Sequence, residues 1–393
     1  MPRSHDIVIA GAGIAGLSTA LALARQGIPV RIFERREAAA TDTGAGLQLS
    51  PNAMQVMHAL GINDDIEAHA AEPREIAVRD AYFGAQVAQL PLGAAARQRY
   101  GAPYLTIDRP TLRRILLTRC QALGVSMVFG TPVRAYNDSG SPIDIELADN
   151  GGTQASALVI ADGVHSALTV SLGGADPEFS GFVAWRALVD NGGSRDHSGT
   201  RTQLWVGRGA HIVTYPVASG RLLNVLACAR EAHWPHRRWS EPADPHDLAH
   251  RFRRWHREVR SVLQRCRSVY KWGLHVRDPL ARWSRGPVIA IGDACHPMLP
   301  FAAQGAAQAI EDAWAVATAL ARHADPSAAF SAVDSARRDR VSDVVAESRA
   351  RAELYHGGVL GQLARPALAT RIGGIDSSMD WLYGYRVTAE DGL

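Results

Sequence analysis

The stretch IVIAGAGIAG, residues 7–16, decides the fold of this chain. Its four leading apolar residues predict a strand that is buried in a parallel sheet. The glycines after them have the spacing GxGxxG, and Leu17–Gln26 then predicts a helix. In this pattern Gly11 permits a tight turn, Gly13 lets a pyrophosphate approach the backbone, and Gly16 lets the helix pack on the strand. The stretch therefore predicts a dinucleotide-binding unit.

A second predicted strand, Pro29–Phe33, ends in the carboxylate of Glu34 and completes a strand–loop–helix–strand unit. An acid at this place accepts hydrogen bonds from both ribose hydroxyls and repels a 2′-phosphate. The amino end of the helix offers free N–H groups to the pyrophosphate. We therefore expect the adenosine of FAD or NAD here, and not that of NADP. The residues assigned to this half of the site are Gly11, Gly13, Ala15, Gly16, Glu34 and Arg35.

A comparable segment, Ile291–Pro297, follows the apolar run 288–290 near the other end of the chain. Asp293 comes directly after this predicted strand, where ligands of open α/β sheets bind, and its carboxylate can accept hydrogen bonds from a polyol. Gln304–Ala307 then opens a predicted helix, whose N–H groups suit the electron-rich edge of a flavin. Two such loops, far apart in sequence, favour FAD over NAD. This second half of the site is assigned to Asp293, Gly305, Ala306 and Ala307.

A third strand-to-turn segment, Leu158–Ser166, contains the pair Asp162–Gly163 and lies between the other two. The chain therefore carries three motifs in order: GxGxxG, a middle DG and a late GD. This order resembles the fingerprint of the class A FAD-dependent aromatic hydroxylases, which have the para-hydroxybenzoate hydroxylase fold. This resemblance implies an α/β protein: a Rossmann-like FAD-binding domain, an inserted substrate domain with a mostly antiparallel β-sheet, and a C-terminal helical cap. The expected boundaries are 1–75, 100–170 and 280–345 for the FAD-binding domain, 76–99 and 171–279 for the substrate domain, and 346–393 for the cap.

Four local matches narrow the resemblance to the salicylate, 3-hydroxybenzoate and 6-hydroxynicotinate hydroxylases. They are 44–52, 107–112, 179–186 and 381–385. The resemblance implies that Gly46, Gln48, Arg109 and Asp162 contact FAD. The chain departs from the family pattern at Leu168 and Thr169, where an arginine usually follows the DG motif. The coenzyme that reduces FAD, NADH or NADPH, stays open.

The residues predicted to face the substrate come from the middle of the chain. His211 and Tyr215 are four apart on one predicted strand, so they point to the same face, and either can accept a phenol proton. The alternatives are a solvated edge histidine and a tyrosine that only ends its strand. Pro300 is expected at the ring edge and joins these two as a catalytic candidate. The substrate pocket is assigned to Gln48, Trp185, His211, Tyr215 and Phe301.

Trp185 and Arg186 are neighbours on one predicted strand, so their side chains point to opposite faces of the sheet. Trp185 is interpreted as a wall of the pocket or as core. Arg186 either binds a carboxylate or pairs with an acid of the protein. Farther along, the apolar spacing of Leu248, Phe252, Trp255, Val259 and Leu263 predicts one helix that packs on the sheet. Ala328–Tyr355 predicts a long helix, closed by Gly357-Gly358.

The composition excludes several other classes of protein. The chain has 393 residues, a net charge of +3 and scattered arginines, which argue against a nucleic-acid partner. Its four cysteines form no CxxC pair, so we expect no metal site, no disulfide scaffold and a cytoplasmic location. No apolar run is long enough to span a bilayer, and no signal peptide is expected. A monomer and a homodimer are both compatible with the sequence.

The resemblance implies an FAD-dependent monooxygenase that hydroxylates a small phenolic or hydroxy-heteroaromatic acid. In that reaction NAD(P)H reduces FAD, O2 adds to form a flavin C4a-hydroperoxide, and one oxygen atom reaches the ring. The partners are then the aromatic substrate, NAD(P)H and O2. Two alternatives stay open. The first is a related monooxygenase with a non-phenolic substrate, such as an epoxidase, a urate-type enzyme or an antibiotic-modifying enzyme. The second is a flavin-binding protein without catalysis.

Overall fold

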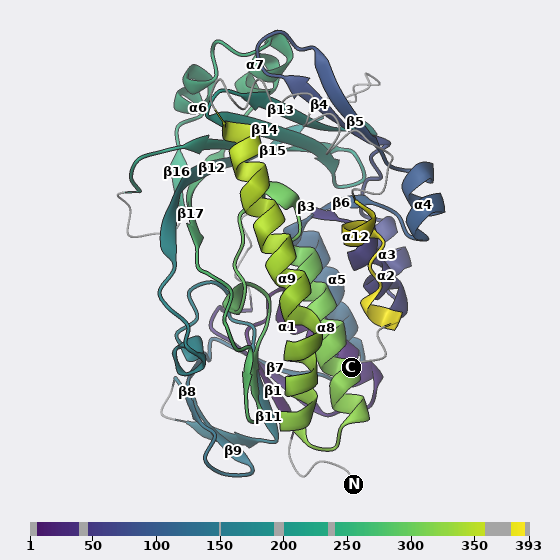
Figure 1. Cartoon of the computed structure of the whole chain (residues 1–393), viewed down its shortest axis with the longest axis vertical. Coiled ribbons are helices and arrows are strands. Elements are labelled where there is room, and N and C mark those ends of the chain that lie inside the picture. Colours follow the sequence, from purple (N-terminus) through teal and green to yellow (C-terminus); the bar gives the residue numbers. More distant parts are fainter. Residues whose placement is uncertain are drawn as a thin grey trace.

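The fold is that of a computed structural model, which describes residues 6–38, 46–148, 151–191, 200–234, 240–357 and 379–389. Two large β-sheets lie at opposite ends of the molecule, and helices pack between and beside them (Figure 1). The lower sheet in this view contains the first strand of the chain, and the upper sheet contains strands from its middle. In the described part of the chain, no helix is long and apolar enough to cross a membrane.

The lower sheet has six strands in the order β18-β19-β11-β1-β2-β7, parallel except for the pair β18–β19. The central strand β1 is fully buried, as its unbroken apolar run predicts. β1 pairs with β2 on one side and with β11 on the other, which places all three predicted ligand loops at one edge of the sheet. The strands are β1 (Ile7–Ala10), β2 (Val30–Glu34), β7 (Ser126–Phe129), β11 (Ala157–Ile160), β18 (Ser284–Arg285) and β19 (Val288–Ala290).

Three helices pack around this sheet, and α1 lies against both of the others. They are α1 (Ile14–Arg25), α5 (Arg109–Ala122) and α8 (Gly305–Arg322). The carboxylate of Asp108 caps α5 by accepting from the Thr111 amide at 2.9 Å. The predicted helices after the first and second glycine loops are both confirmed, each starting close to its loop.

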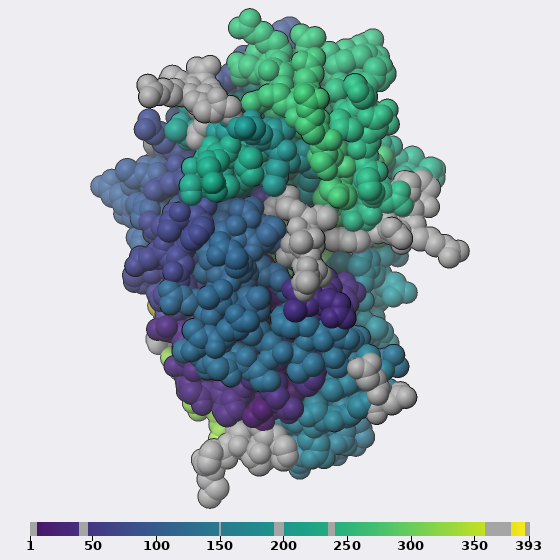
Figure 2. Space-filling model, turned by 180° about the vertical axis from the view of Figure 1, so that it is seen from behind, coloured from purple at the N-terminus to yellow at the C-terminus, as the bar shows by residue number. Residues whose placement is uncertain are grey.

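The upper sheet has eight strands in the order β16-β17-β12-β15-β14-β13-β4-β5. Every neighbouring pair is antiparallel except β13–β4. Seen from behind, the residues coloured green gather at one end of the molecule and the purple and blue residues make up most of the rest (Figure 2). The strands are β4 (Glu75–Asp80), β5 (Gln86–Pro91), β12 (Glu178–Asp190), β13 (Thr202–Gly207), β14 (Ala210–Val217), β15 (Leu222–Arg230), β16 (Ser240–Ala243) and β17 (Val269–Val276).

The predicted fold class, a Rossmann-like domain with a mostly antiparallel sheet inserted in the chain, is confirmed. One helix prediction within the upper part is wrong. Leu248 lies on α6 (Pro245–Arg251), and Val259 and Leu263 lie on α7 (Arg257–Gln264), whereas Phe252 and Trp255 lie in the turn between the two helices. The chain leaves the helical path between them, where His256 caps α7. All five apolar side chains are still buried in one cluster beside the sheet.

The long helix α9 (Pro326–His356) joins the two ends of the molecule (Figure 1). It contacts β18 and β19 of the lower sheet and β13 and β14 of the upper sheet. Its amino end is capped by the carboxylate of Asp325, which accepts from the amide of Ser327 at 3.0 Å. Gly357 follows its last residue, as predicted, whereas Gly358 lies outside the described residues.

The remaining elements are short and connect these layers. The strand pair β3 (Gly46–Leu49) and β6 (Leu105–Asp108) lies between the two sheets, and a separate three-stranded sheet lies beside the lower one. That sheet comprises β8 (Val133–Asn137), β9 (Ile143–Leu147) and β10 (Gly152–Ala155). The short helices are α2 (Pro51–Ala59), α3 (Asn63–Glu67), α4 (Ala94–Tyr100), α12 (Asp380–Tyr383), η1 (Leu168–Leu172), η3 (Gly292–Ala294), η4 (Pro300–Ala302) and η5 (Val387–Ala389).

Candidate active site

A cavity of about 240 Å³ opens where the lower sheet, the upper sheet and the pair β3–β6 meet. Ten residues that the sequence assigned to cofactor or substrate line it: Gly13, Ala15, Gly46, Gln48, Arg109, Tyr215, Asp293, Pro300, Gly305 and Ala306. The other lining residues were not among those assignments, and they are Ile14, Leu47, Ala161, Gly163, Arg186, Asn224, Leu226, Met298, Leu299, Ala303 and Ala309. The cavity thus gathers segments from both glycine loops and from both sheets.

The first glycine loop has the geometry of a phosphate cradle. Gly11 has φ +107°, and a Cβ atom there would lie 2.5 Å from the carbonyl oxygen of Ala161. A Cβ atom on Gly13, in contrast, would meet no atom within 4 Å, so the space in front of this residue is open. The loop therefore leaves room for a ligand at the amino end of α1, where the free N–H groups of a helix can bind an anion.

The two glycine loops touch each other in space. Gly292 has φ +56°, and a Cβ atom there would lie 3.1 Å from Ala15 on α1 and 3.3 Å from Ala309 on α8. The carboxylate of Asp293 lies close to Gly305 at the start of α8. The loops that are far apart in the sequence therefore form one continuous binding surface, as a single ligand spanning both would require.

Two carboxylates stand behind this surface. Glu34 is buried; its Oε2 accepts from the amide of Ala12 at 2.6 Å and its Oε1 from the amide of Arg36 at 2.9 Å. Asp162 has a buried Oδ1 atom without a hydrogen-bond partner. Burial raises the pKa of Asp162 to about 6. An unpartnered buried acceptor in this place fits a ligand that carries hydroxyl groups.

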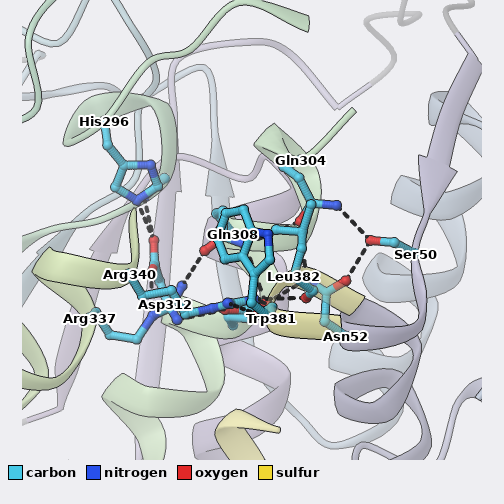
Figure 3. Close-up of polar contacts among 12 residues, drawn as sticks. Ser50, Asn52, His296, Gln304, Gln308, Asp312, Arg337, Arg340, Trp381 and Leu382 are labelled. Carbon is cyan, nitrogen blue, oxygen red and sulfur yellow. Dashed lines mark hydrogen bonds and ion pairs between the residues drawn. The ribbon is translucent and has the colours of Figure 1, made fainter. Parts of the chain in front are cut away.

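The second loop is held from behind by a buried polar network that the sequence analysis did not identify (Figure 3). Oδ2 of Asp312 lies 3.0 Å from the amide of Gly292 and 2.6 Å from Nε2 of His296. Oδ1 of Asp312 accepts from Nε of Arg337 on α9 at 3.0 Å. The side chains of Asp312 and Arg337 have no exposed surface, and the nearby positive charges keep the pKa of Asp312 below its usual value despite burial.

The network continues from Arg340 to Trp381 and Leu382 in the C-terminal part of the chain (Figure 3), and Glu311 links Arg340 to Arg337. Glu311 accepts from Arg337 at 2.6 Å, from Arg340 at 2.8 Å and from the side-chain amide of Asn52 at 2.5 Å. Arg340 also donates to the carbonyl oxygens of Trp381 and Leu382. Because each buried charge has partners, the network fixes α8, and with it the loop that faces the cavity.

Arg186 is one of two arginines that line the cavity, together with Arg109. It lies on β12 and lines the cavity with Leu226, its neighbour on β15. Its Nε atom is buried and has no hydrogen-bond partner, and no carboxylate among the described residues pairs with it. Burial lowers the pKa of this guanidinium, and the positive charge of Arg109 lowers it further. A negatively charged ligand in the cavity would supply the missing partner.

Of the two interpretations of Trp185, pocket wall or core, the structure supports core, so its assignment to the substrate pocket is corrected. Its side chain lies on the other face of the sheet, edge-to-face with Phe252 and beneath the charged group of Lys271. Side chains alternate along a strand, so the residue that β12 presents to the cavity is Arg186. Alternation alone could not say which of the two neighbours faces the ligand.

Tyr215 lies deep in the cavity wall, close to Gly46 of β3. A Cβ atom on Gly46 would lie 2.8 Å from the hydroxyl of Tyr215 and 2.7 Å from the side chain of Asn224. Asn224 accepts from the Gly46 amide at 2.8 Å and hydrogen-bonds the Tyr215 hydroxyl, whose pKa is raised by burial. The glycine therefore permits the closest approach between β3 and the upper sheet. Gln48 lines the cavity beside it and accepts from the hydroxyl of Tyr104 at 2.7 Å.

Two other predicted substrate residues do not line the cavity. His211 and Phe301 are both buried and pack edge-to-face with ring centroids 5.0 Å apart. Phe301 directly follows Pro300, which does line the cavity, and His211 lies on the same face of β14 as Tyr215. Neither residue is among those that line the cavity, so their roles at the substrate stay predictions. Gly44 and Ala45, which begin the matched segment 44–52, lie outside the described residues.

A second cavity, of about 410 Å³, lies on the reverse face of the upper sheet under α7. Its cations already have partners: Arg79 lies 3.4 Å from Glu258, and Arg201 lies 2.6 Å from Glu75. It holds none of the residues predicted to bind cofactor or substrate. We therefore place the active site at the cavity between the sheets.

The family model for an FAD binding domain matches residues 4–348. The chain belongs to this FAD-binding family. It is 35% identical over 389 residues to a 3-amino-4-hydroxybenzoate 2-monooxygenase of Streptomyces platensis, covering 96% of each chain. It is 31% identical to a 3-hydroxybenzoate 6-hydroxylase of Polaromonas naphthalenivorans, covering 98% of this chain and 97% of the relative.

Solved structures show the same likeness over nearly the whole length. A substrate complex of salicylate hydroxylase superposes with a TM-score of 0.83 at 27% identity, covering 98% of this chain and 96% of that one. Klebsiella pneumoniae HpxO, complexed with FAD and uric acid, gives a TM-score of 0.83 at 26% identity and covers 94% of each chain. The prediction of an FAD-dependent aromatic-hydroxylase fold and of a flavoprotein monooxygenase is confirmed.

Proposed function

We propose that this monooxygenase hydroxylates a small aromatic acid that carries a ring hydroxyl or amino group, with NADH or NADPH as reductant and O2 as oxidant. The observation that carries the proposal is Arg186, a guanidinium at the cavity with a buried donor that nothing in the described protein satisfies. A carboxylate on the substrate is the partner that such a group prefers, because it accepts hydrogen bonds and also neutralises the charge.

The residues present fit FAD. We expect the open loop at Gly13, with Glu34, to hold the adenosine half. The partnerless Oδ1 of Asp162 and the exposed carboxylate of Asp293 would accept hydrogen bonds from hydroxyl groups of the connecting chain. The start of α8 at Gly305 would lie against the flavin ring. FAD, when bound, supplies the redox chemistry and the activation of oxygen.

The protein's own side chains then orient the substrate and exclude water. Arg186 binds the carboxylate, while Tyr215 and Asn224 line the cavity and hold its wall closed against β3. Leu226 and Leu299 supply apolar surface, which keeps the reacting ring in a water-poor space. We assign to His211 the role of accepting the proton of the phenol, since it lies on the same strand face as Tyr215.

The relatives' names favour aromatic acids over other substrates, since these relatives are named for a hydroxybenzoate, an amino-hydroxybenzoate or 6-hydroxynicotinate. A urate-type reaction is the second candidate, because HpxO with uric acid has the same fold and an anionic urate would also satisfy Arg186. Epoxidation gains no support from the cavity, since an alkene offers no partner to a buried cation.

A substrate panel tests the proposal. Coenzyme oxidation and product formation are measured with 3-amino-4-hydroxybenzoate, 3-hydroxybenzoate and salicylate, each beside its counterpart without the carboxylate, and with urate. We expect the acids to exceed their neutral counterparts by at least about 30-fold in kcat/KM, the equivalent of ~2 kcal/mol. Equal turnover of the neutral compounds, or turnover of urate alone, would refute the aromatic-acid assignment.

The four cysteines are free in the structure, which supports the proposed cytoplasmic location.

A further inference from the structure

Two buried histidines form a pair behind the cavity. His211, on β14, and His356, the last residue of α9, have 1% and 3% of their surface exposed. Nδ1 of His211 lies 2.8 Å from Nε2 of His356. The rings of Phe182, Phe301 and Tyr355 surround the pair, with centroids 4.8 to 5.2 Å from one or other histidine. This contact joins the upper sheet to the end of the helix that spans the molecule.

The hydrogen-bond chain fixes which nitrogens carry protons. Nδ1 of His356 lies 3.0 Å from the carbonyl oxygen of Ala352, which can only accept, so this nitrogen carries a hydrogen. Burial lowers the pKa of His356 to about 4 and that of His211 well below its usual value, so both rings are neutral near pH 7. Nε2 of His356 is therefore an acceptor, and Nδ1 of His211 is its donor. The consequence is that Nε2 of neutral His211 carries no hydrogen.

We infer that His356 is a positioning residue for His211: it fixes the tautomer that leaves Nε2 of His211 free to accept a proton from the substrate hydroxyl, and it accepts the Nδ1 proton in turn. This inference rests on the proposed function, in which His211 receives that proton.

The transfer balances within the pair. The substrate O–H bond breaks and an N–H bond forms at Nε2 of His211, while the Nδ1 proton passes to Nε2 of His356. The pair then carries one positive charge, with Nδ1–H of His356 still donating to Ala352. When the product oxygen is protonated again, the proton returns along the same path and both rings are neutral.

The described residues around the pair offer no carboxylate to balance this charge. The groups that face the pair are Tyr355 from α9 and Arg230 and Cys228 from β15. The positive charge of Arg230 disfavours a charged His356, although Glu353 pairs with Arg230 at 3.1 Å on the surface. No carboxylate among the described residues lies against either ring to hold the proton there. The phenolate oxygen that the transfer creates is therefore the negative charge that balances the protonated pair.

The test uses the holoenzyme and a spectroscopic probe, 4-hydroxy-3-nitrobenzoate, whose phenolate absorbs at longer wavelength than its neutral form. Difference spectra report how much of the bound probe is ionised, independently of turnover. We expect wild type to bind the probe mainly as phenolate near pH 7, and His356→Leu to bind it mainly as the neutral phenol. Arg349→Ala, an exposed change on the same helix that removes an ion pair with Asp278, is the control and should match wild type.

Two further variants separate positioning from packing. His356→Gln keeps an acceptor for Nδ1 of His211 but cannot take a proton, so its ionised fraction should lie between those of wild type and His356→Leu. In a His211→Leu background, adding His356→Leu should cause less than a 2-fold further loss of kcat, whereas in wild type it should lower kcat at least about 10-fold.

Two results would overturn the inference. If His356→Leu binds the probe as phenolate to the same extent as wild type, the pair has no role in accepting the proton. If the two histidine changes are additive in kcat, His356 contributes to packing alone. Failure of wild type to bind any aromatic acid is a different outcome, because it would remove the proposed function together with the inference.

Discussion

Nε of Arg337 lies 3.0 Å from Oδ1 of Asp312, and neither side chain has any exposed surface. The pair joins α9 to α8 directly behind the loop that begins at Gly292. Because Glu311 and Asp312 both depend on this guanidinium, its removal would leave two buried carboxylates undercompensated.

We therefore predict that Arg337→Ala lowers the free energy of unfolding by about 3–5 kcal/mol. Arg349→Ala, on the same helix, removes an exposed ion pair with Asp278 and should cost under about 1 kcal/mol. Urea unfolding of both variants beside wild type checks the difference. Similar losses in the two variants would show that the buried network does not stabilise the fold.

Glycine substitutions separate binding from folding. A methyl group on Gly13 projects into open space, so Gly13→Ala should fold with a stability within about 1 kcal/mol of wild type but bind FAD at least about 10-fold more weakly. Gly11→Ala places the methyl group against the backbone of Ala161 at positive φ and should destabilise the protein itself by over about 2 kcal/mol. Fluorescence titration with FAD and thermal unfolding measure the two effects. A Gly13→Ala protein with normal FAD affinity would contradict the placement of the pyrophosphate.

The charge of Arg186 should make the enzyme prefer aromatic acids to neutral phenols. Arg186→Met keeps the apolar stem but removes the charge, so KM for an aromatic acid should rise at least about 30-fold, from a loss of ~2 kcal/mol or more. KM for the matching neutral phenol should change by less than about 3-fold. Steady-state kinetics with each pair of compounds measure both values. An equal rise for the acid and for the phenol would mean that Arg186 supports the cavity without reading the carboxylate.

Asp162 predicts a pH dependence of stability in the FAD-free protein. Burial raises its pKa to about 6 in the folded state, against about 4 in the unfolded chain. The folded state holds the proton more tightly, so the stability lost by ionising Asp162 grows as pH rises from about 4 to about 6 and is complete above that. Asp162→Asn should then be more stable than wild type by up to about 3 kcal/mol at pH 8, and equally stable near pH 4.

Urea unfolding at several pH values checks this difference. Asp144→Asn, at an exposed position on β9, should change the stability by less than about 0.5 kcal/mol throughout. A gain for Asp162→Asn that does not vary with pH would show that ionisation of this carboxylate is not its cause.

Local sequence signals account for most of the cofactor half of the site. The buried run 7–10, the glycines after it and the acid at Glu34 act through neighbours along the chain, so their pattern predicts both the elements and the ligand. The start of α8 at Gly305 follows from the same kind of local pattern. These segments lie at one sheet edge because parallel pairing of β1, β2, β11 and β19 requires it.

The substrate half depends on contacts that no local pattern contains. The alternation of side chains on β12 does not show whether Trp185 or Arg186 faces the cavity. The pairing of β12 with β15 and β17 in the sheet decides it. The ion pair between Asp312 and Arg337 and the contact between His211 and His356 each join residues that are far apart in the chain. The sequence pattern also did not predict the break between α6 and α7. The apolar spacing continues across the break, and the side chains there are buried as they would be in one helix.

The central claim is that the enzyme transfers one oxygen atom from O2 to an aromatic acid. Turnover of 3-amino-4-hydroxybenzoate or 3-hydroxybenzoate under ¹⁸O2, with NADH or NADPH, tests it directly by mass spectrometry of the product. We predict one new ring oxygen per product molecule, labelled with ¹⁸O, and coenzyme oxidation that the acid stimulates. A product whose new oxygen comes from water, or coenzyme oxidation that no aromatic acid stimulates, would contradict the claim.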